Sequence, residues 1–191
     1  MKNLPNILAF TGFTVLCAVA FLAPKEKIPE QIPNESITIT EEIKQTYPVK
    51  ISIESIGVNA PIEAVGILDG AMAVPSFGHN VGWYSLGTVP GEVGSAVLAG
   101  HVNWKNGEDA VFTNLEEVKI GDIITVTNNY GAVTNFRVTD IQNFPLWTDT
   151  TEIFSADDGI VRLNLITCTG AWNDWLSTHS ERLVVFSEKI Y

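Results

Sequence analysis

Short runs of alternating or β-branched apolar residues recur along most of this chain, separated by turn-forming residues. Alternation with a period of two is typical of β-strands that bury one face. The separating segments are rich in Gly, Pro and Asn, which β-turns favour. The pattern therefore predicts seven strands, at residues 49–53, 60–65, 95–99, 122–127, 133–141, 161–167 and 182–187, with turns at 66–70, 90–94 and 128–131.

Helical periodicity is scarce by comparison. The clearest candidate is residues 110–118, a short amphipathic segment that places Val111, Phe112 and Leu115 on one face. Seven or eight strands within about 140 residues predict one mainly β domain, built as a closed or sandwich-like antiparallel sheet with one or two short helices.

The first 47 residues differ in kind from the rest. Residues 4–23 carry no charge, and at about 1.5 Å per helical residue they could cross a hydrocarbon layer of about 30 Å. Ala18-Val19-Ala20 is similar to a signal-peptidase site, so a cleaved signal peptide is one interpretation. The apolar run continues past that site, which favours an uncleaved membrane anchor over residues 1–23. Residues 24–47, rich in Pro, Glu and Lys, are then a linker or stalk, and residues 48–191 are the folded domain.

Charge and composition exclude several classes of function. The chain carries 22 acidic against 11 basic residues, a formal net charge of −11, which disfavours nucleic acid and anionic lipid as partners of the domain. The three histidines lack metal-ligand spacing, and the acidic residues between 149 and 158 lack the pattern of a calcium loop. The glycines at 91 and 94 lack the Lys and Ser/Thr of a phosphate loop. No metal or organic cofactor is therefore expected.

Candidate chemistry centres on Cys168, the only cysteine beyond residue 17. It ends the apolar run 161–167 and has no partner for a disulfide in the domain, so its thiol is either an inert core group or a nucleophile. A nucleophilic thiol needs a base or a cation nearby. His101 follows the strand at 95–99 and Arg182 opens the strand at 182–187, so an antiparallel return would bring all three to one rim.

Each partner also has a structural interpretation. A histidine at a strand end is often only hydrogen-bonded, and Arg182 has Glu181 and Glu188 nearby for a surface ion pair. The combination favours chemistry, because each of the three residues is expected at a strand terminus.

At these positions the chain resembles the sortases, the membrane-anchored cysteine transpeptidases of Gram-positive and related bacteria. Leu165-Ile-Thr-Cys168 resembles the TLxTC signature of the family, Ala99-Gly-His101 its histidine strand, and Arg182-Leu-Val-Val its arginine strand. The motifs are most similar to those of the class F subgroup, at Val74-Pro75, Gly82-Trp-Tyr84, Pro90-Gly91-x-x-Gly94-Ser-Ala-Val97 and Ala99-Gly-His-Val102. The resemblance covers about residues 48–191 and implies a closed eight-stranded sortase-like β-barrel.

The resemblance implies a function as well. Cys168 would attack an LPxTG-like sorting signal of a surface protein and form a thioacyl enzyme, with His101 as general acid and base and Arg182 stabilising the oxyanion. The acyl group would pass to an amine acceptor such as a peptidoglycan precursor, and the domain would lie outside the cytoplasm, tethered to the cell membrane by a single pass. The loop at 143–159 would form an apolar pocket for the signal. The candidate substrate-binding residues are Thr167, Pro145, Leu146, Trp147 and Trp172.

The chain departs from the family pattern at two positions. Asn164 stands where the signature usually has threonine, and Asn103 stands where an acidic residue often follows the histidine motif, which leaves the partner that orients His101 open. Two alternatives also remain open at this point. One is another cell-wall cysteine hydrolase or acyltransferase, and the other is a non-enzymatic anchored β-barrel that binds peptide or glycan, with Cys168 as a core residue.

Overall fold

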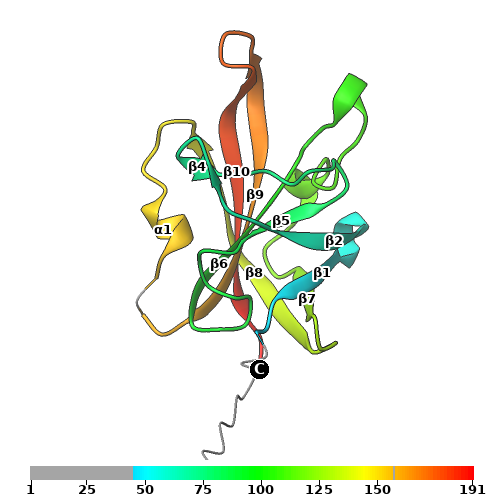
Figure 1. Ribbon diagram of the computed structural model, residues 1–191, viewed down its shortest axis with the longest axis vertical. Coiled ribbons are helices and arrows are strands. Elements are labelled where there is room, and N and C mark those ends of the chain that lie inside the picture. Colours follow the sequence, from blue (N-terminus) through cyan, green and yellow to red (C-terminus); the bar gives the residue numbers. More distant parts are fainter. Residues whose placement is uncertain (1–44, 157) are drawn as a thin grey trace, which may run out of the picture. The chain divides into compact units, whose positions relative to one another are not determined.

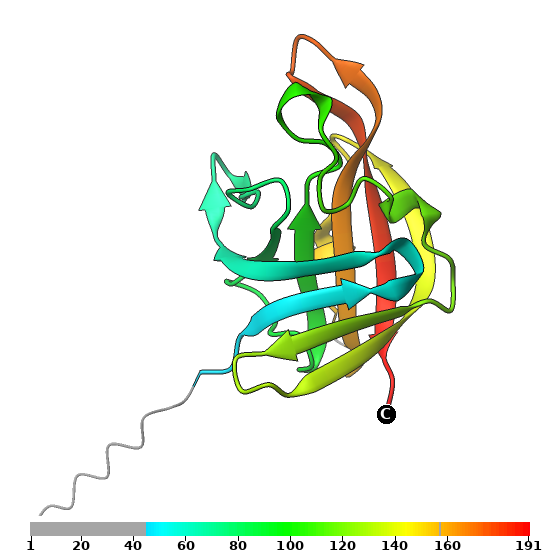
Figure 2. The same ribbon diagram turned by 90° about the vertical axis from the view of Figure 1, so that its right-hand side faces the viewer.

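The protein is described by a computed structural model over residues 45–156 and 158–191. Eight strands close into a barrel in the order β1-β2-β5-β6-β9-β10-β8-β7 (Figures 1 and 2). They are β1 (Pro48–Ile53), β2 (Val58–Val65), β5 (Val81–Tyr84), β6 (Gly94–Gly100), β7 (Ile123–Asn128), β8 (Val133–Pro145), β9 (Val161–Asn173) and β10 (Thr178–Lys189). The mainly β, closed eight-stranded barrel is therefore confirmed.

The remaining elements are short. A two-stranded hairpin, β3 (Ile67–Leu68) and β4 (Ala71–Met72), lies outside the barrel sheet. The described residues contain one four-residue α-helix, α1 (Thr151–Phe154), and three 3₁₀ turns, η1 (Glu54–Ile56), η2 (Lys105–Gly107) and η3 (Leu115–Glu117).

Four features differ from the sequence-based expectations. The eighth strand, β5, was not predicted because four residues with three buried positions show no alternation. The turn expected at 66–70 forms part of the β3–β4 hairpin, which extends from Ile67 to Met72. The sheet is not wholly antiparallel, because β2 pairs in parallel with β5 and β6 with β9. Such pairs need a crossover connection instead of a tight turn.

The fourth difference concerns the helices. Residues 110–118 form turns and η3 instead of an amphipathic α-helix, although Phe112 and Leu115 are fully buried as the pattern predicted. The α-helix lies instead at α1, within a segment expected to be a loop. In both segments the apolar side chains pack into the apolar clusters of the barrel, and helices this short depend on such packing more than on helix propensity.

The barrel interior is filled by the inward-facing residues of the strands. They form one continuous apolar cluster that includes Ile51, Leu98, Phe136, Leu163, Leu165 and Val185, all nearly inaccessible to solvent. Phe112 packs against the backbone of Gly100 so closely that a Cβ there would lie 2.5 Å from its ring. Glycine at position 100 therefore lets the chain pass over the core at the end of β6.

A smaller apolar cluster covers the outer face of β6, β8 and β10. Val97, Phe144, Ile153 and Val184 form it, with Met72, Tyr84 and Phe154 packed against them. These residues come from the barrel strands, from α1 and from the region of the β3–β4 hairpin, which lie on one side of the barrel (Figure 1). The central strands are consequently buried on both faces.

The predicted membrane anchor at 1–23 and nearly all of the linker at 24–47 lie outside the described residues. Within residues 45–156 and 158–191, no helix is both long and apolar enough to cross a bilayer. The described residues belong to one compact unit, and the domain boundary at residue 48 stays a prediction.

Candidate active site

Strand pairing places Cys168 and Arg182 directly opposite each other on adjacent strands. They are antiparallel partners in the β9–β10 ladder, in which facing side chains lie about 5 Å apart at Cβ. Because side chains alternate along a strand, Cys168 shares the outer face with Asn164 and Ile166, and Arg182 shares it with Val184. Both side chains therefore point away from the barrel core.

His101 reaches the same region through the parallel pairing of β6 with β9. That ladder aligns Ala99 with Ile166, and one residue further the buried Thr167 hydroxyl donates a 2.8 Å hydrogen bond to the Gly100 carbonyl. The next residues are His101 on one strand and Cys168 on the other. The Thr167 hydroxyl thus links the two strands immediately before His101 and Cys168.

The three residues line one cavity of about 540 Å³ on the outer face of the barrel. Its floor comes from β6, β9 and β10, including Ala99, Ile166 and Val184. One wall comes from the segment around α1 and the other from the β3–β4 hairpin. The wall residues include Ile67, Met72, Val74, Leu146, Trp147, Ile153 and Phe154. A thiol, an imidazole and a guanidinium thus meet in a largely apolar groove.

The ring of His101 is oriented by a backbone group. Its Nε2 lies 3.2 Å from the carbonyl oxygen of Pro75. A carbonyl can only accept, so Nε2 carries the hydrogen and Nδ1 is the nitrogen left to exchange a proton. The partner that the sequence left open is therefore the Pro75 carbonyl. Asn103 is exposed instead and forms a β-bridge with Asp109.

The guanidinium of Arg182 is held by groups at the start of its own strand. Nη1 donates to the carbonyls of His179 (3.1 Å) and Glu181 (2.9 Å), and Nη2 donates to Thr178 Oγ1 (3.1 Å). The ion pairs among the described residues involve Arg162, which contacts Asp158 at 2.6 Å and Glu188 at 3.6 Å. Within that part of the chain Arg182 forms no ion pair, and its strand position lies directly opposite Cys168.

Cys168 and Arg182 do not lie at strand termini as expected. β9 continues five residues beyond Cys168, and β10 begins four residues before Arg182. The extra length forms a hairpin that extends beyond the barrel (Figures 1 and 2). Only His101 directly follows the end of its strand.

The predicted substrate-binding residues divide into two groups. Leu146, Trp147 and Thr167 line the cavity, and Trp147 is 83% exposed. Pro145 and Trp172 are not among the lining residues, and Trp172 packs at 5.4 Å against the ring of His179 on the projecting hairpin. The structure thus brings three of the five candidates to the groove.

The wall around α1 is fixed by two polar contacts. Asn164 is fully buried and donates from its amide to the carbonyl of Ile153 (2.7 Å), so the unusual residue of the signature connects β9 to α1. Asp149 accepts hydrogen bonds from the hydroxyl (2.6 Å) and the backbone N–H (2.9 Å) of Thr151, which lower the pKa of its carboxyl. These bonds stabilise the start of α1.

Sequence reasoning missed the hairpin wall and the floor of the groove. A signal for them existed, because residues 95–99 of β6 are apolar or small at every position, which is typical of a strand covered on both faces. It did not indicate which segment provides the cover. Met72 and Val74 reach the groove only because the chain between β2 and β5 folds back as a hairpin.

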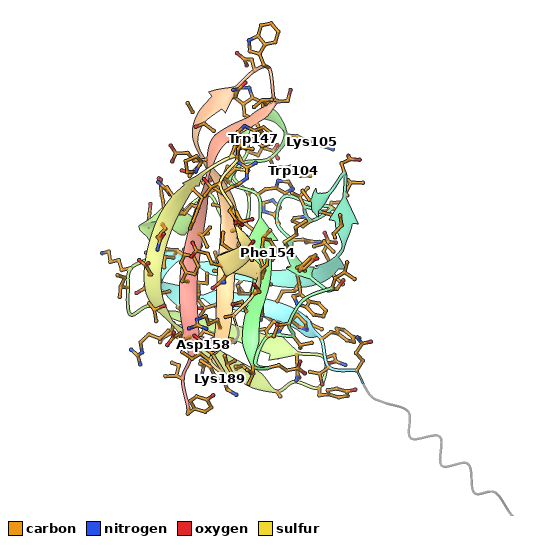
Figure 3. The ribbon with its side chains drawn as sticks, turned by 90° about the vertical axis from the view of Figure 1, so that its left-hand side faces the viewer. Trp104, Lys105, Trp147, Phe154, Asp158 and Lys189 are labelled. Carbon is orange, nitrogen blue, oxygen red and sulfur yellow. The ribbon has the colours of Figure 1, made fainter. Side chains whose placement is uncertain are left out.

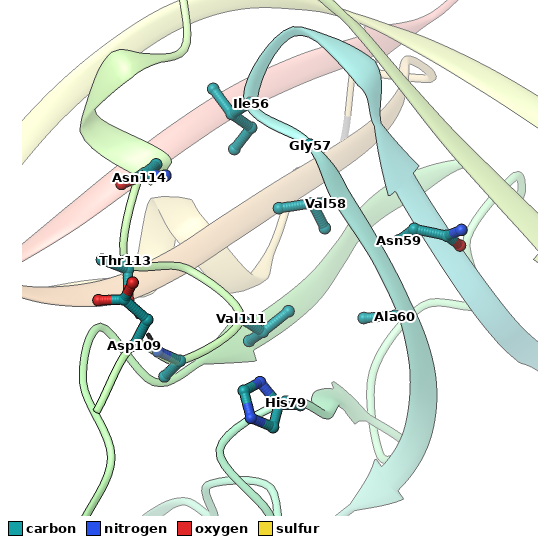
Figure 4. A pocket seen from close by; sticks show the side chains of 11 residues that line it. Ile56, Gly57, Val58, Asn59, Ala60, His79, Asp109, Val111, Thr113 and Asn114 are labelled. Atoms are coloured by element: carbon teal, nitrogen blue, oxygen red, sulfur yellow. Dashed lines mark hydrogen bonds between the residues drawn. The ribbon is translucent and has the colours of Figure 1, made fainter. Parts of the chain in front are cut away.

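A second cavity of about 250 Å³ lies elsewhere, between the start of β2 and the segment 109–114 (Figure 4). His79 and Asp109 are among its lining residues. None of the predicted site residues lines it, so the larger groove is the candidate active site.

Comparison with known proteins identifies the family of the chain. The sequence matches the Sortase domain family over residues 51–190. No curated protein sequence matches the chain.

Among solved structures, the lid mutant of sortase A from Corynebacterium diphtheriae has a TM-score of 0.59 at 25% identity, covering 79% of this chain and 74% of that one. Sortase C1 from Streptococcus agalactiae has a TM-score of 0.60 at 21% identity and covers 75% and 67%. A sortase D5 transpeptidase from Clostridium perfringens has 0.58 at 24% identity and covers 76% and 79%. With a family match over most of its length and a fold shared with these enzymes, the chain belongs to the sortase family of cysteine transpeptidases.

Proposed function

We propose that this sortase cleaves an LPxTG-like sorting signal through a thioacyl intermediate on Cys168 and transfers the surface protein to an amine of the cell envelope. The observation that carries the proposal is the convergence of Cys168, His101 and Arg182 on one groove from three adjacent strands. A thiol, a proton-exchanging ring and a fixed cation can together supply the nucleophile, the acid and base, and the oxyanion donor of acyl transfer.

In the acylation step, the thiol proton of Cys168 passes to His101, and Sγ attacks the scissile carbonyl carbon and forms a C–S bond. The oxyanion that develops on the carbonyl oxygen is stabilised by the guanidinium of Arg182, whose own hydrogen bonds hold it in place. His101 then gives a proton to the leaving nitrogen as the C–N bond breaks. The products are a thioacyl enzyme and a free amine.

In the transfer step, the acceptor amine attacks the thioester carbon. A new C–N bond forms and the C–S bond breaks, while His101 takes the proton that the amine loses and passes it to the departing Sγ. Cys168 and His101 return to their starting state. If water attacks instead, the same steps release a hydrolysed signal.

The apolar walls of the groove are the proposed site for the leucine and proline of the signal. Leu146, Trp147 and Phe154 on one side and Met72 and Val74 on the other offer apolar contact without charge. Apolar lining beside a few polar groups is typical of pockets that hold a peptide in one orientation.

The proposal includes location and subgroup. Residues 1–23 are proposed to anchor the protein in the cell membrane by a single pass, with the catalytic domain outside the cytoplasm. The assignment to class F rests on the sequence motifs; the three solved sortases described above belong to classes A, C and D.

A direct test uses an LPxTG-type peptide and iodoacetamide. We expect the peptide to be cleaved, a peptide–enzyme thioester to be trapped on Cys168, and prior alkylation of Cys168 to abolish both. Cleavage without a thioester on Cys168 would support a different hydrolase, and an unreactive Cys168 would support the non-enzymatic β-barrel.

A further inference from the structure

Trp104 contacts the catalytic histidine from outside the groove. It follows His101 by three residues and immediately precedes η2. The two rings lie 5.0 Å apart between centroids and are tilted by 58°, within the range of favourable aromatic contacts. Trp104 is half-buried and does not line the cavity, so it contacts His101 without being in position to contact substrate.

The Trp104 indole packs against the loop between β4 and β5. A Cβ at Gly78 would lie 2.6–2.9 Å from three atoms of the Trp104 side chain, so only glycine leaves room for the indole. The carbonyl of Gly78 accepts a 2.8 Å hydrogen bond from Val111 N–H. The same loop supplies the Pro75 carbonyl that accepts from His101 Nε2. One loop therefore contacts both aromatic rings.

Backbone hydrogen bonds also hold the segment that carries His101 and Trp104. Trp104 N–H donates to the Glu108 carbonyl (2.7 Å), and Gly107 N–H donates back to the Trp104 carbonyl (3.1 Å). Phe112 N–H donates to the His101 carbonyl (3.0 Å). Figure 3 shows Trp104 and Lys105 toward the same end of the barrel as Trp147.

The contact between Trp104 and His101 acts by orienting the imidazole more than by attracting its charge. The Lys105 ammonium lies 5.2 Å from the centroid of the indole. The Trp104 ring therefore already makes one cation–π contact before any contact with a protonated His101. Packing instead limits rotation of the imidazole, and rotation would break the bond from Nε2 to Pro75. Losing that bond would remove the preference for the Nε2–H tautomer.

We propose that Trp104 is a positioning residue that holds the imidazole of His101 against the Pro75 carbonyl, so that Nδ1 is the nitrogen that exchanges protons in the reaction. The second half of this statement rests on the proposed function. The first half concerns the free protein and can be tested without substrate.

The first experiment measures the tautomer of His101 in the free protein by ¹⁵N-edited NMR of the imidazole. The wild type should show the Nε2–H form. Trp104→Phe should keep it, because an aromatic ring still packs between Gly78 and His101. Trp104→Leu should give a mixture of tautomers. Trp175→Leu is the matched control, because Trp175 is 97% exposed and lies on the projecting hairpin. An unchanged tautomer in Trp104→Leu would overturn the inference, whatever the protein catalyses.

The second experiment compares single-turnover acylation by an LPxTG-type peptide and by the same peptide with a thioester at the scissile bond. A departing thiolate needs no proton from His101, whereas a departing amine does. Trp104→Leu should slow the amide reaction about tenfold with little change in KM, and the thioester reaction much less. Equal slowing of both substrates would contradict positioning of the acid. A wild type that cleaves neither would refute the proposed function and leave the tautomer result to decide the inference.

Discussion

The two faces of β6, β9 and β10 differ sharply, although successive residues of the same strands supply both. The inner face carries Leu98, Leu163, Leu165 and Val185, which are inaccessible to solvent and belong to the barrel core. The outer face carries Cys168 and Arg182, with His101 just beyond the end of β6, along a groove open to solvent. A period of two thus separates the barrel core from the proposed site within single strands, so that neighbouring residues should respond to mutation in different ways.

The largest effect is expected on the outer face. Cys168→Ala should abolish cleavage of a sorting peptide, because no other thiol lies in the folded domain. The melting temperature should stay close to that of the wild type, because a half-buried thiol on the outer face leaves little cavity when removed. Peptide cleavage and thermal unfolding measure the two properties. Activity within tenfold of the wild type would mean that Cys168 is not the nucleophile.

Arg182→Lys should lower kcat/KM by about 10²-fold or more, because an ammonium cannot reproduce the guanidinium fork that is fixed by three hydrogen bonds. Arg162→Lys is the matched control, since Arg162 pairs with Asp158 and Glu188 at the other end of β9. Steady-state kinetics on one peptide compare the two variants. Equal activities of Arg182→Lys and Arg162→Lys would remove Arg182 from the site.

A pair of adjacent residues makes the comparison sharper. Leu165→Ala should lower the free energy of unfolding by about 2–5 kcal/mol, because Leu165 is fully buried in the barrel core. Ile166→Ala should cost less stability, because Ile166 is partly exposed, but it should raise KM by removing part of the groove floor. Denaturant unfolding and peptide kinetics give both quantities. A reversed order of the two stability losses would show that the faces are not divided in this way.

The smallest effect is expected at the far end of β9. The bidentate contact with Arg162 and the N–H of Ile160 lower the pKa of Asp158 from 3.8 to about 2. Because the folded protein binds this proton more weakly than the unfolded chain, the carboxylate stabilises the fold above about pH 4, and that contribution disappears as the pH falls through about 2. Asp158→Asn should lower the melting temperature by at most about 2 °C at neutral pH, since the pair is exposed to solvent.

Melting curves of the wild type and of Asp158→Asn from pH 7 to pH 2 test this expectation. The two curves should converge at the acidic end. A difference that grew toward low pH would contradict the sign of the linkage.

The sequence by itself determined the strands with clear alternation and the mainly β class, and it singled out the three candidate catalytic residues, because these depend on local periodicity and on residue chemistry. It also held a signal, not used in the sequence analysis, that β6 is covered on both faces. It could not determine β5, whose four residues lack a readable period, or the parallel pairings, which depend on how long connections cross the barrel. Only the tertiary structure supplied the Pro75 carbonyl for His101 and the walls of the groove around Cys168, because these contacts join segments far apart in the chain and are selected by packing.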